Sequence, residues 1–127
     1  MTQVLLYSLL AILLVIWLRR MLLMRSVTQY SAAQLAGRLQ EKPSPVLLDV
    51  RTTAEHRSGA IKGSVHIPLQ ELRSRIGEVR KFGEREVVVY CQTGSRSLSA
   101  AGILRKQGIT VANLKGGIAE WNFAGLR

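Results

Sequence analysis

Cysteine, proline and acidic side chains are scarce in this 127-residue chain. It has one cysteine, three prolines and 8 Asp plus Glu against 18 Lys plus Arg, giving a formal net charge of +10. A single cysteine excludes an internal disulfide and any multi-cysteine metal cluster, so the fold must depend on apolar burial. The 47% hydrophobic content excludes a disordered chain. The length allows one domain.

The one long apolar run lies at the N-terminus. Residues 1–18 are predominantly apolar, and a helix of this length would span ~27 Å, close to the ~30 Å hydrocarbon core of a bilayer. Trp17 lies near the end of the run, beside Arg19 and Arg20, an arrangement typical of a helix end at the lipid headgroups. The sequence therefore predicts a transmembrane helix with a basic flank over residues 1–24.

The charges around this run predict its orientation. No basic side chain precedes it, whereas Arg19, Arg20 and Arg25 follow it. A cleaved signal peptide has the reverse order, with positive charge before the apolar run and small residues after it. We therefore expect a single-pass protein of the inner (cytoplasmic) membrane whose C-terminal part faces the cytoplasm. The rest of the chain also carries a net positive charge, so it should be attracted to anionic lipid. It has no basic motif that alternates with aromatic residues, so no nucleic-acid partner is expected.

Residues 26–127 are predicted to form one α/β domain with a central, mainly parallel β-sheet flanked by helices, because short apolar runs alternate with helical patterns. Strands are expected at residues 46–50, 65–67, 87–90 and 109–114. Helices are expected at residues 31–40, 69–79 and 97–107, with a short one at the Thr52–Glu55 capping box and a closing one around Trp121. The run at 87–90 lacks polar alternation, which predicts a central strand covered on both faces.

Cys91 follows the predicted central strand and begins a loop that leads into a helix. Open α/β sheets bind ligands at the carboxyl ends of their strands. Such a loop can turn successive backbone N–H groups inward, and these groups, the helix N-terminus and Arg96 would stabilise an anion. A cysteine there should be a reactive thiolate, with Gly94 supplying the backbone freedom of a tight loop. The alternative is a buried cysteine that packs as a small hydrophobic side chain.

Three ordered motifs stand out in the part of the chain that follows the apolar run. They are Leu48-Asp49-Val50-Arg51 with Glu55 and residues 59–68, then Cys91-Gln92-Thr93-Gly94-Ser95-Arg96-Ser97, and then Leu114-Lys115-Gly116-Gly117 with Trp121. In this order they resemble the signatures of the rhodanese-like family of sulfurtransferases. The second motif is similar to the Cys-x-x-Gly-x-Arg-Ser active loop of that family. His66 stands where the family often has Asn.

The resemblance implies a sulfurtransferase that needs no cofactor and no metal ion. A Cys91 thiolate would attack a small anionic donor such as thiosulfate, and the resulting persulfide would pass its outer sulfur to cyanide, a thiol or a protein acceptor. Asp49, Arg51 and Ser97 would support the loop, the first two as a buried pair. The substrate-binding residues would be Gln92, Thr93, Gly94, Ser95 and Arg96.

Two other functions share part of this pattern. Cysteine phosphatases also use a Cys…Arg loop between a strand and a helix, but with one more residue than the four between Cys91 and Arg96. They also need a general acid, for which Asp49 on a buried strand is poorly placed. A non-enzymatic rhodanese-like binding or scaffold module is the other alternative, and the intact Cys91 and Arg96 argue against it. His56 and His66 have no metal-ligand spacing with Cys91.

Overall fold

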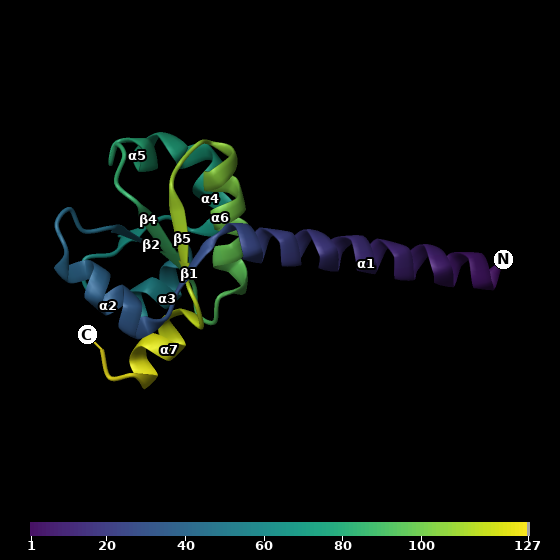
Figure 1. Cartoon of the computed structure of the whole chain (residues 1–127), viewed down its shortest axis with the longest axis horizontal. Helices are drawn as coiled ribbons and strands as arrows, with labels where there is room; N and C mark the ends of the chain where they lie inside the picture. Colours follow the sequence, from purple (N-terminus) through teal and green to yellow (C-terminus); the bar gives the residue numbers. More distant parts are fainter. Residues whose placement is uncertain (127) are drawn as a thin grey trace.

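One long helix, α1 (Thr2–Ser26), projects from an α/β domain formed by the rest of the chain (Figure 1). The computed structural model describes residues 1–126, except for the side chains of Leu23 and Met24, so the expected domain end at Arg127 lies outside the described residues. The span Thr2–Leu22 has a mean hydropathy of 2.0 and is not buried. It is long and apolar enough to cross a membrane, a property that signal sequences share.

The domain contains a five-stranded sheet in the order β1-β5-β4-β2-β3, and every pairing is parallel. β4 lies at the centre and all of its residues are buried, which confirms the expected central strand. The strands are β1 (Thr28–Tyr30), β2 (Val46–Asp49), β3 (Val65–His66), β4 (Val87–Tyr90) and β5 (Val111–Leu114).

Helices cover both faces of this sheet, as the alternation of patterns predicts. One face carries α2 (Ala32–Gln40), α3 (Thr53–Ser58) and α7 (Gly117–Phe123), and the other carries α4 (Leu69–Leu72), α5 (Ile76–Arg80) and α6 (Ser95–Lys106) (Figure 1). Capping boxes begin α2 and α3, because the side chains of Ser31 and Thr52 accept hydrogen bonds from the backbone three residues later.

Apart from shifts of one or two residues at element ends, two elements differ from the expectation. The helix expected at residues 69–79 is interrupted by a 3₁₀ turn, Arg73–Arg75, between α4 and α5. Gly77, which follows this turn, has a low helix propensity. The short strand β1 was not expected, because three residues with polar side chains give no recognisable apolar pattern.

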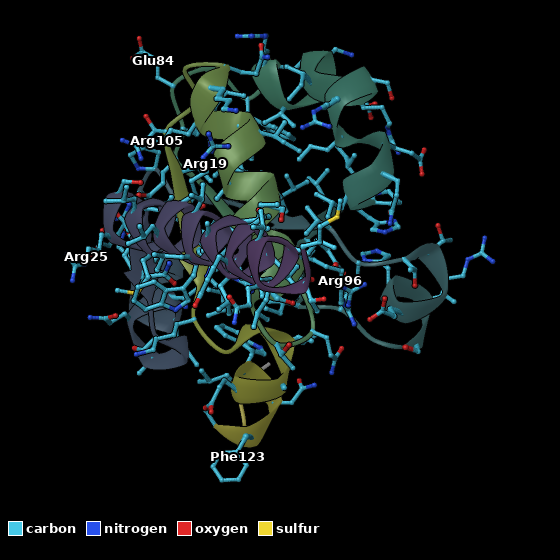
Figure 2. The ribbon with its side chains drawn as sticks, turned by 90° about the vertical axis from the view of Figure 1, so that its right-hand side faces the viewer. Arg19, Arg25, Glu84, Arg96, Arg105 and Phe123 are labelled. Atoms are coloured by element: carbon cyan, nitrogen blue, oxygen red, sulfur yellow. The ribbon has the colours of Figure 1, made fainter. Side chains whose placement is uncertain are left out.

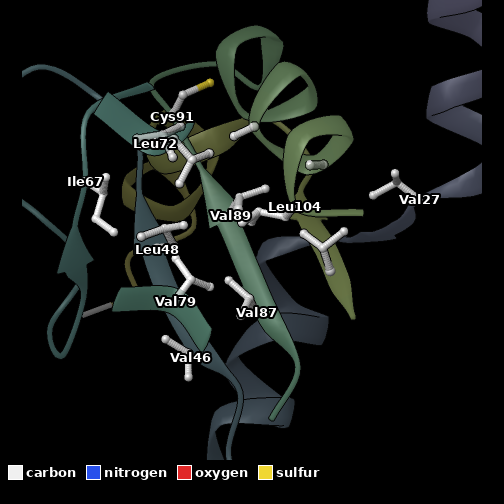
Figure 3. Packing of buried hydrophobic residues seen from close by; sticks show 14 residues of the cluster. Val27, Val46, Leu48, Ile67, Leu72, Val79, Val87, Val89, Cys91 and Leu104 are labelled. Carbon is white, nitrogen blue, oxygen red and sulfur yellow. The ribbon is translucent and has the colours of Figure 1, made fainter. Parts of the chain in front are cut away.

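Alternate residues of β4 pack into two separate cores. Val87 and Val89 lie with Cys91 in the core beneath α4, α5 and α6, which Figure 3 shows from close by. Val88 and Tyr90 lie in the second core, beneath α2 and α7. Successive side chains of a strand point to opposite faces, and this places the Cys91 sulfur on the α6 side of the sheet.

The chain leaves the neighbouring strands β2 and β4 in opposite directions. From β2 it passes through α3 to β3 at one edge, and from β4 it passes through α6 to β5 on the other side. A parallel sheet has a crevice at such a point, at the carboxyl ends of the strands, and ligands usually bind there. Arg51 follows β2, Cys91 follows β4 and Lys115 follows β5, so the fold brings all three sequence motifs to the carboxyl ends of the strands.

Candidate active site

The Cys91 sulfur is surrounded by hydrogen-bonding groups of the loop that follows it, residues 91–97, called the Cys91 loop below. The backbone N–H of Gly94 donates to Sγ at an N···S distance of 3.0 Å, and the Ser97 Oγ lies 3.5 Å from Sγ. Ser97 also donates to the carbonyl of Gly94. Cys91 is 1% exposed, but these polar neighbours distinguish it from a cysteine that packs only against apolar side chains.

These neighbours favour the thiolate form of Cys91. Burial raises the pKa of the thiol, but the hydrogen bond with the Ser97 side chain and those from the backbone N–H groups of Ser97, Gly94 and Thr93 outweigh burial and lower the pKa. Donors that face a charged group stabilise its charged form. Because the thiolate is the nucleophilic form of cysteine, the loop makes Cys91 more reactive at neutral pH than an ordinary buried thiol.

The start of α6 contributes to this environment. The helix begins at Ser95, two residues earlier than expected, and Gly94 precedes it with a φ of +112° in the left-handed region. A side chain at this position would strain the backbone. The turn at Gly94 directs the first N–H groups of the helix towards the sulfur, and the N-terminus of a helix stabilises negative charge.

The start of α7 forms backbone hydrogen bonds with the Cys91 loop. The N–H groups of Ile118 and Ala119 donate to the carbonyl oxygens of Cys91 and Gln92 at 3.0 and 3.1 Å. A Cβ on Gly117 would lie 2.5 Å from these same two oxygens, so only glycine permits this approach. Because these carbonyls point towards α7, the N–H groups of the loop can point towards the sulfur.

Asp49 and Arg51 form the buried pair that the sequence predicts. They are 0% and 3% exposed, and the Nε and Nη2 groups of Arg51 donate to the Asp49 carboxylate at 3.0 and 2.8 Å. His56 and Tyr90 also contact this carboxylate. Burial raises the pKa of Asp49, but hydrogen bonds from Arg51 and His56 lower it to a net value below the usual one. Arg51 also donates to the Gln92 side chain at 3.4 Å, which links β2 to the Cys91 loop.

Arg96 forms a bidentate ion pair with Glu55. Its Nη1 and Nη2 groups donate to the two carboxylate oxygens at 2.7 and 2.8 Å, which joins the start of α6 to α3. The hydrogen bond from Arg96 holds the pKa of Glu55 at about 2. The same hydrogen bond raises the pKa of Arg96, with a smaller contribution from the charge of Cys91. The sequence placed Glu55 in a capping box and in the family signature, but gave no sign of this contact.

The other predicted residues lie on the outer side of the loop. Thr93, Gly94 and Ser95 line a hollow of about 250 Å³ that faces α1. Ser95 and Arg96 line a second hollow of about 480 Å³ beside it. Within residues 1–126, no cluster of three or more His, Cys, Asp and Glu side chains could hold a metal ion.

Comparison with known proteins connects this geometry to a family. The family model of the rhodanese-like domain matches residues 31–124. A sulfurtransferase of Allochromatium vinosum is 37% identical over 101 residues, which cover 79% of this chain and 92% of that protein. The thiosulfate:glutathione sulfurtransferase of Homo sapiens is 34% identical over 88 residues, which cover 59% of this chain and 76% of that protein.

A solved structure shows the same fold over most of the chain. It is a protein of unknown function from Rhodopseudomonas palustris, described as a possible tyrosine phosphatase, with a TM-score of 0.76 and 27% identity over 85% of this chain and 89% of that one. Some curated relatives are longer, and this chain covers 59%, 39% and 20% of the length of three of them. Since the family model covers most of the chain and the bacterial sulfurtransferase is matched over nearly its whole length, this chain belongs to the rhodanese-like family of sulfurtransferases.

Proposed function

We propose that this protein transfers sulfane sulfur through a persulfide on Cys91. The Cys91 thiolate attacks the outer sulfur of thiosulfate, an S–S bond forms to Cys91, and the S–S bond of thiosulfate breaks with its electron pair leaving on sulfite. A thiol or cyanide acceptor then attacks the outer sulfur of the persulfide and releases the Cys91 thiolate. The observation that supports this proposal best is the Gly94 N–H, which lies 3.0 Å from the sulfur and stabilises its charge.

The same geometry argues against phosphate-ester hydrolysis. The carboxylate of Asp49 is 0% exposed and is bound by Arg51, His56 and Tyr90, so it is not available to protonate a leaving group. The Cys91 loop also has one N–H group fewer than a phosphatase loop, and the smaller cradle suits a sulfur atom better than a phosphoryl group. Sulfur transfer without phosphatase activity is the expected result of parallel assays.

Within this mechanism, we propose that the loop binds the donor through its backbone and through Arg96. In the free protein the Arg96 guanidinium is occupied by Glu55. An anionic donor must therefore compete with a carboxylate for Arg96. The substrate-binding group would comprise Gln92, Thr93, Gly94, Ser95 and Arg96.

Substitutions of this ion pair test the role of Arg96. We expect Arg96→Ala to raise the thiosulfate KM roughly ten- to a hundredfold, the effect of losing a charge-assisted hydrogen bond of ~1.5–3 kcal/mol. Arg96→Lys should restore only part of this loss, because lysine lacks the planar fork. Glu55→Gln should lower the KM, since it removes the competing charge and keeps a side chain that fits a capping box.

Arg105→Ala is the matched control, because Arg105 is a basic residue at the opposite end of the same helix. It should leave the thiosulfate KM unchanged. An unchanged KM in Arg96→Ala, together with reduced stability, would show that Arg96 only joins α6 to α3.

We also propose that α1 anchors residues 26–127 in the cytoplasmic membrane, with the domain on the cytoplasmic side. The span Thr2–Leu22 is apolar and exposed, and the basic residues follow it rather than precede it. The chain should therefore remain in the membrane pellet after carbonate washing, and protease outside sealed cells should leave the domain intact. Release by carbonate would contradict the anchor, and digestion from outside would contradict the orientation.

A further inference from the structure

The hollow of about 250 Å³ beside the Cys91 loop is formed by parts of the chain that the proposed sulfur transfer does not use. α1, the sheet strands β1 and β5 and the loop after β5 all contribute to it. We call it the α1–loop hollow. Its polar lining side chains outside the Cys91 loop are Arg20, Gln29, Asn113 and Lys115.

Two side-chain amides on the sheet side of this hollow are only partly paired. Gln29 on β1 and Asn113 on β5 are register partners, and the Asn113 Nδ2 donates to the Gln29 Oε1 at 2.8 Å. The Gln29 Nε2 and the Asn113 Oδ1 are buried without a hydrogen-bond partner, and Asn113 as a whole is 2% exposed. Reversing both amides again leaves one NH₂ and one carbonyl unpaired, with the two residues exchanged.

Buried donors and acceptors without partners are unfavourable and rare in folded proteins. The unpaired NH₂ group needs an acceptor, and the unpaired carbonyl needs a donor. A hydroxyl group supplies both functions. The pair formed by Gln29 and Asn113 therefore suits a ligand that carries hydroxyl groups.

The same hollow is positively charged. Arg20 and Lys115 line it, and no acidic side chain occurs among its described lining residues. The adjoining hollow of about 480 Å³ shares Arg20 and adds Arg19. Among the ion pairs of the described residues, none involves Arg19, Arg20 or Lys115. These cations are therefore available to an anion.

The position of the hollow relates it to the proposed membrane anchor. Arg20 belongs to the last part of the apolar span Thr2–Leu22, where a transmembrane helix meets the lipid headgroups. Figure 2 looks along α1 from its N-terminal end and shows Arg19 and Arg96 on the face of the domain from which the helix projects. In an anchored protein this face is turned towards the membrane surface.

We propose that the α1–loop hollow binds the headgroup of an anionic phospholipid with free hydroxyl groups, such as phosphatidylglycerol. This proposal rests on the proposed anchor. The phosphate pairs with Arg20 and Lys115, while a headgroup hydroxyl accepts from the Gln29 amide and donates to the Asn113 carbonyl. Because residues 93–95 form one wall of the hollow, the bound headgroup holds the outer side of the Cys91 loop against the membrane surface.

Native mass spectrometry of the full chain in mild detergent tests this proposal. Phosphatidylglycerol and phosphatidylcholine are added at equal concentrations, and the fraction of protein carrying each lipid is measured. We expect a preference for phosphatidylglycerol of at least roughly tenfold, the effect of one charge-assisted hydrogen bond. Soluble glycerol phosphate, added at the same concentration as the lipid, should not displace it.

Two double variants distinguish the contribution of the cations to lipid binding from that of the amides. Arg20→Gln with Lys115→Gln should abolish the preference, whereas Arg25→Gln should leave it intact. Arg25 lies on the same helix but outside the lining of the hollow, and it projects away from Arg96 in Figure 2. Gln29→Met with Asn113→Leu keeps both cations, so it should reduce the preference only roughly threefold, the effect of one neutral hydrogen bond.

The thermal unfolding midpoint of the Gln29→Met, Asn113→Leu variant shows whether a reduced lipid preference results from a loss of stability. Replacing both amides by apolar side chains removes the unpaired groups, so this midpoint should not fall. Equal binding of the two lipids by the wild-type chain, or a full preference in the amide variant, would overturn the proposal. Displacement by glycerol phosphate would overturn the membrane source of the ligand. Release of the chain by carbonate would instead refute the anchor.

Discussion

The Cys91→Ser variant should show no sulfur transfer from thiosulfate to cyanide above the uncatalysed rate. Serine has nearly the size of cysteine, but its hydroxyl is not ionised at neutral pH, so the hydrogen bonds around Cys91 have no thiolate to stabilise. Cys91 is the only cysteine in the chain, and no second thiol can carry the persulfide. The measurement is thiocyanate formation by equal amounts of wild-type and variant protein.

A control variant shows whether loss of activity reflects chemistry or folding. Ser99→Ala changes an exposed hydroxyl on α6 outside the Cys91 loop, and it should retain wild-type activity. Cys91→Ser should unfold at the same denaturant concentration as the wild type, because the substitution changes one buried atom. Thiocyanate formation that persists in Cys91→Ser would contradict the mechanism. An inactive wild-type chain with a panel of sulfur donors would favour the binding-module alternative.

The Asp49→Ala variant should lose about 3–5 kcal/mol of unfolding free energy, because it leaves the charge of Arg51 buried without its partner. Asp49 and Arg51 are 0% and 3% exposed and share hydrogen bonds of 2.8 and 3.0 Å. The loss should also reduce sulfur transfer in the folded fraction, since Arg51 contacts the Gln92 side chain. Urea unfolding of the full chain in mild detergent measures the free energy.

An exposed ion pair provides the comparison for Asp49→Ala. Arg75 pairs with Glu78 at 2.6 Å, but the two side chains are 33% and 45% exposed. Glu78→Ala should therefore change the unfolding midpoint little, because exposed pairs contribute little to stability. The double variant Asp49→Leu, Arg51→Met should recover much of the lost stability, since it leaves no buried charge. Equal effects of Asp49→Ala and Glu78→Ala would contradict the bracing role of the buried pair.

Elements with local signals were predictable from the sequence. The apolar run before Cys91 predicted a central strand, and β4 is that strand. The Thr52–Glu55 capping box predicted the start of α3, where it is found. By contrast, β1 has three residues and obtains its stability from pairing with β5, which lies far away in the sequence. A strand that depends on such pairing leaves no local pattern.

The residue types of the site could be predicted from the sequence, but the contacts between them could not. The order of Cys91, Gly94 and Arg96 indicated an anion-stabilising loop, and the resemblance to a family supplied the reaction. The pair formed by Arg96 and Glu55 joins residues 41 positions apart. The support that α7 gives to the loop depends on backbone groups, which no side-chain motif encodes. Both contacts depend on the assembled sheet.

Mass spectrometry of the full chain after incubation with thiosulfate tests the persulfide most directly. We expect a mass increase of one sulfur atom, located on the peptide that contains Cys91 and removed by a thiol or cyanide. The same treatment should leave Cys91→Ser at its original mass. An unmodified Cys91 in folded wild-type protein, after thiosulfate and other sulfane-sulfur donors, would contradict sulfur transfer through this residue.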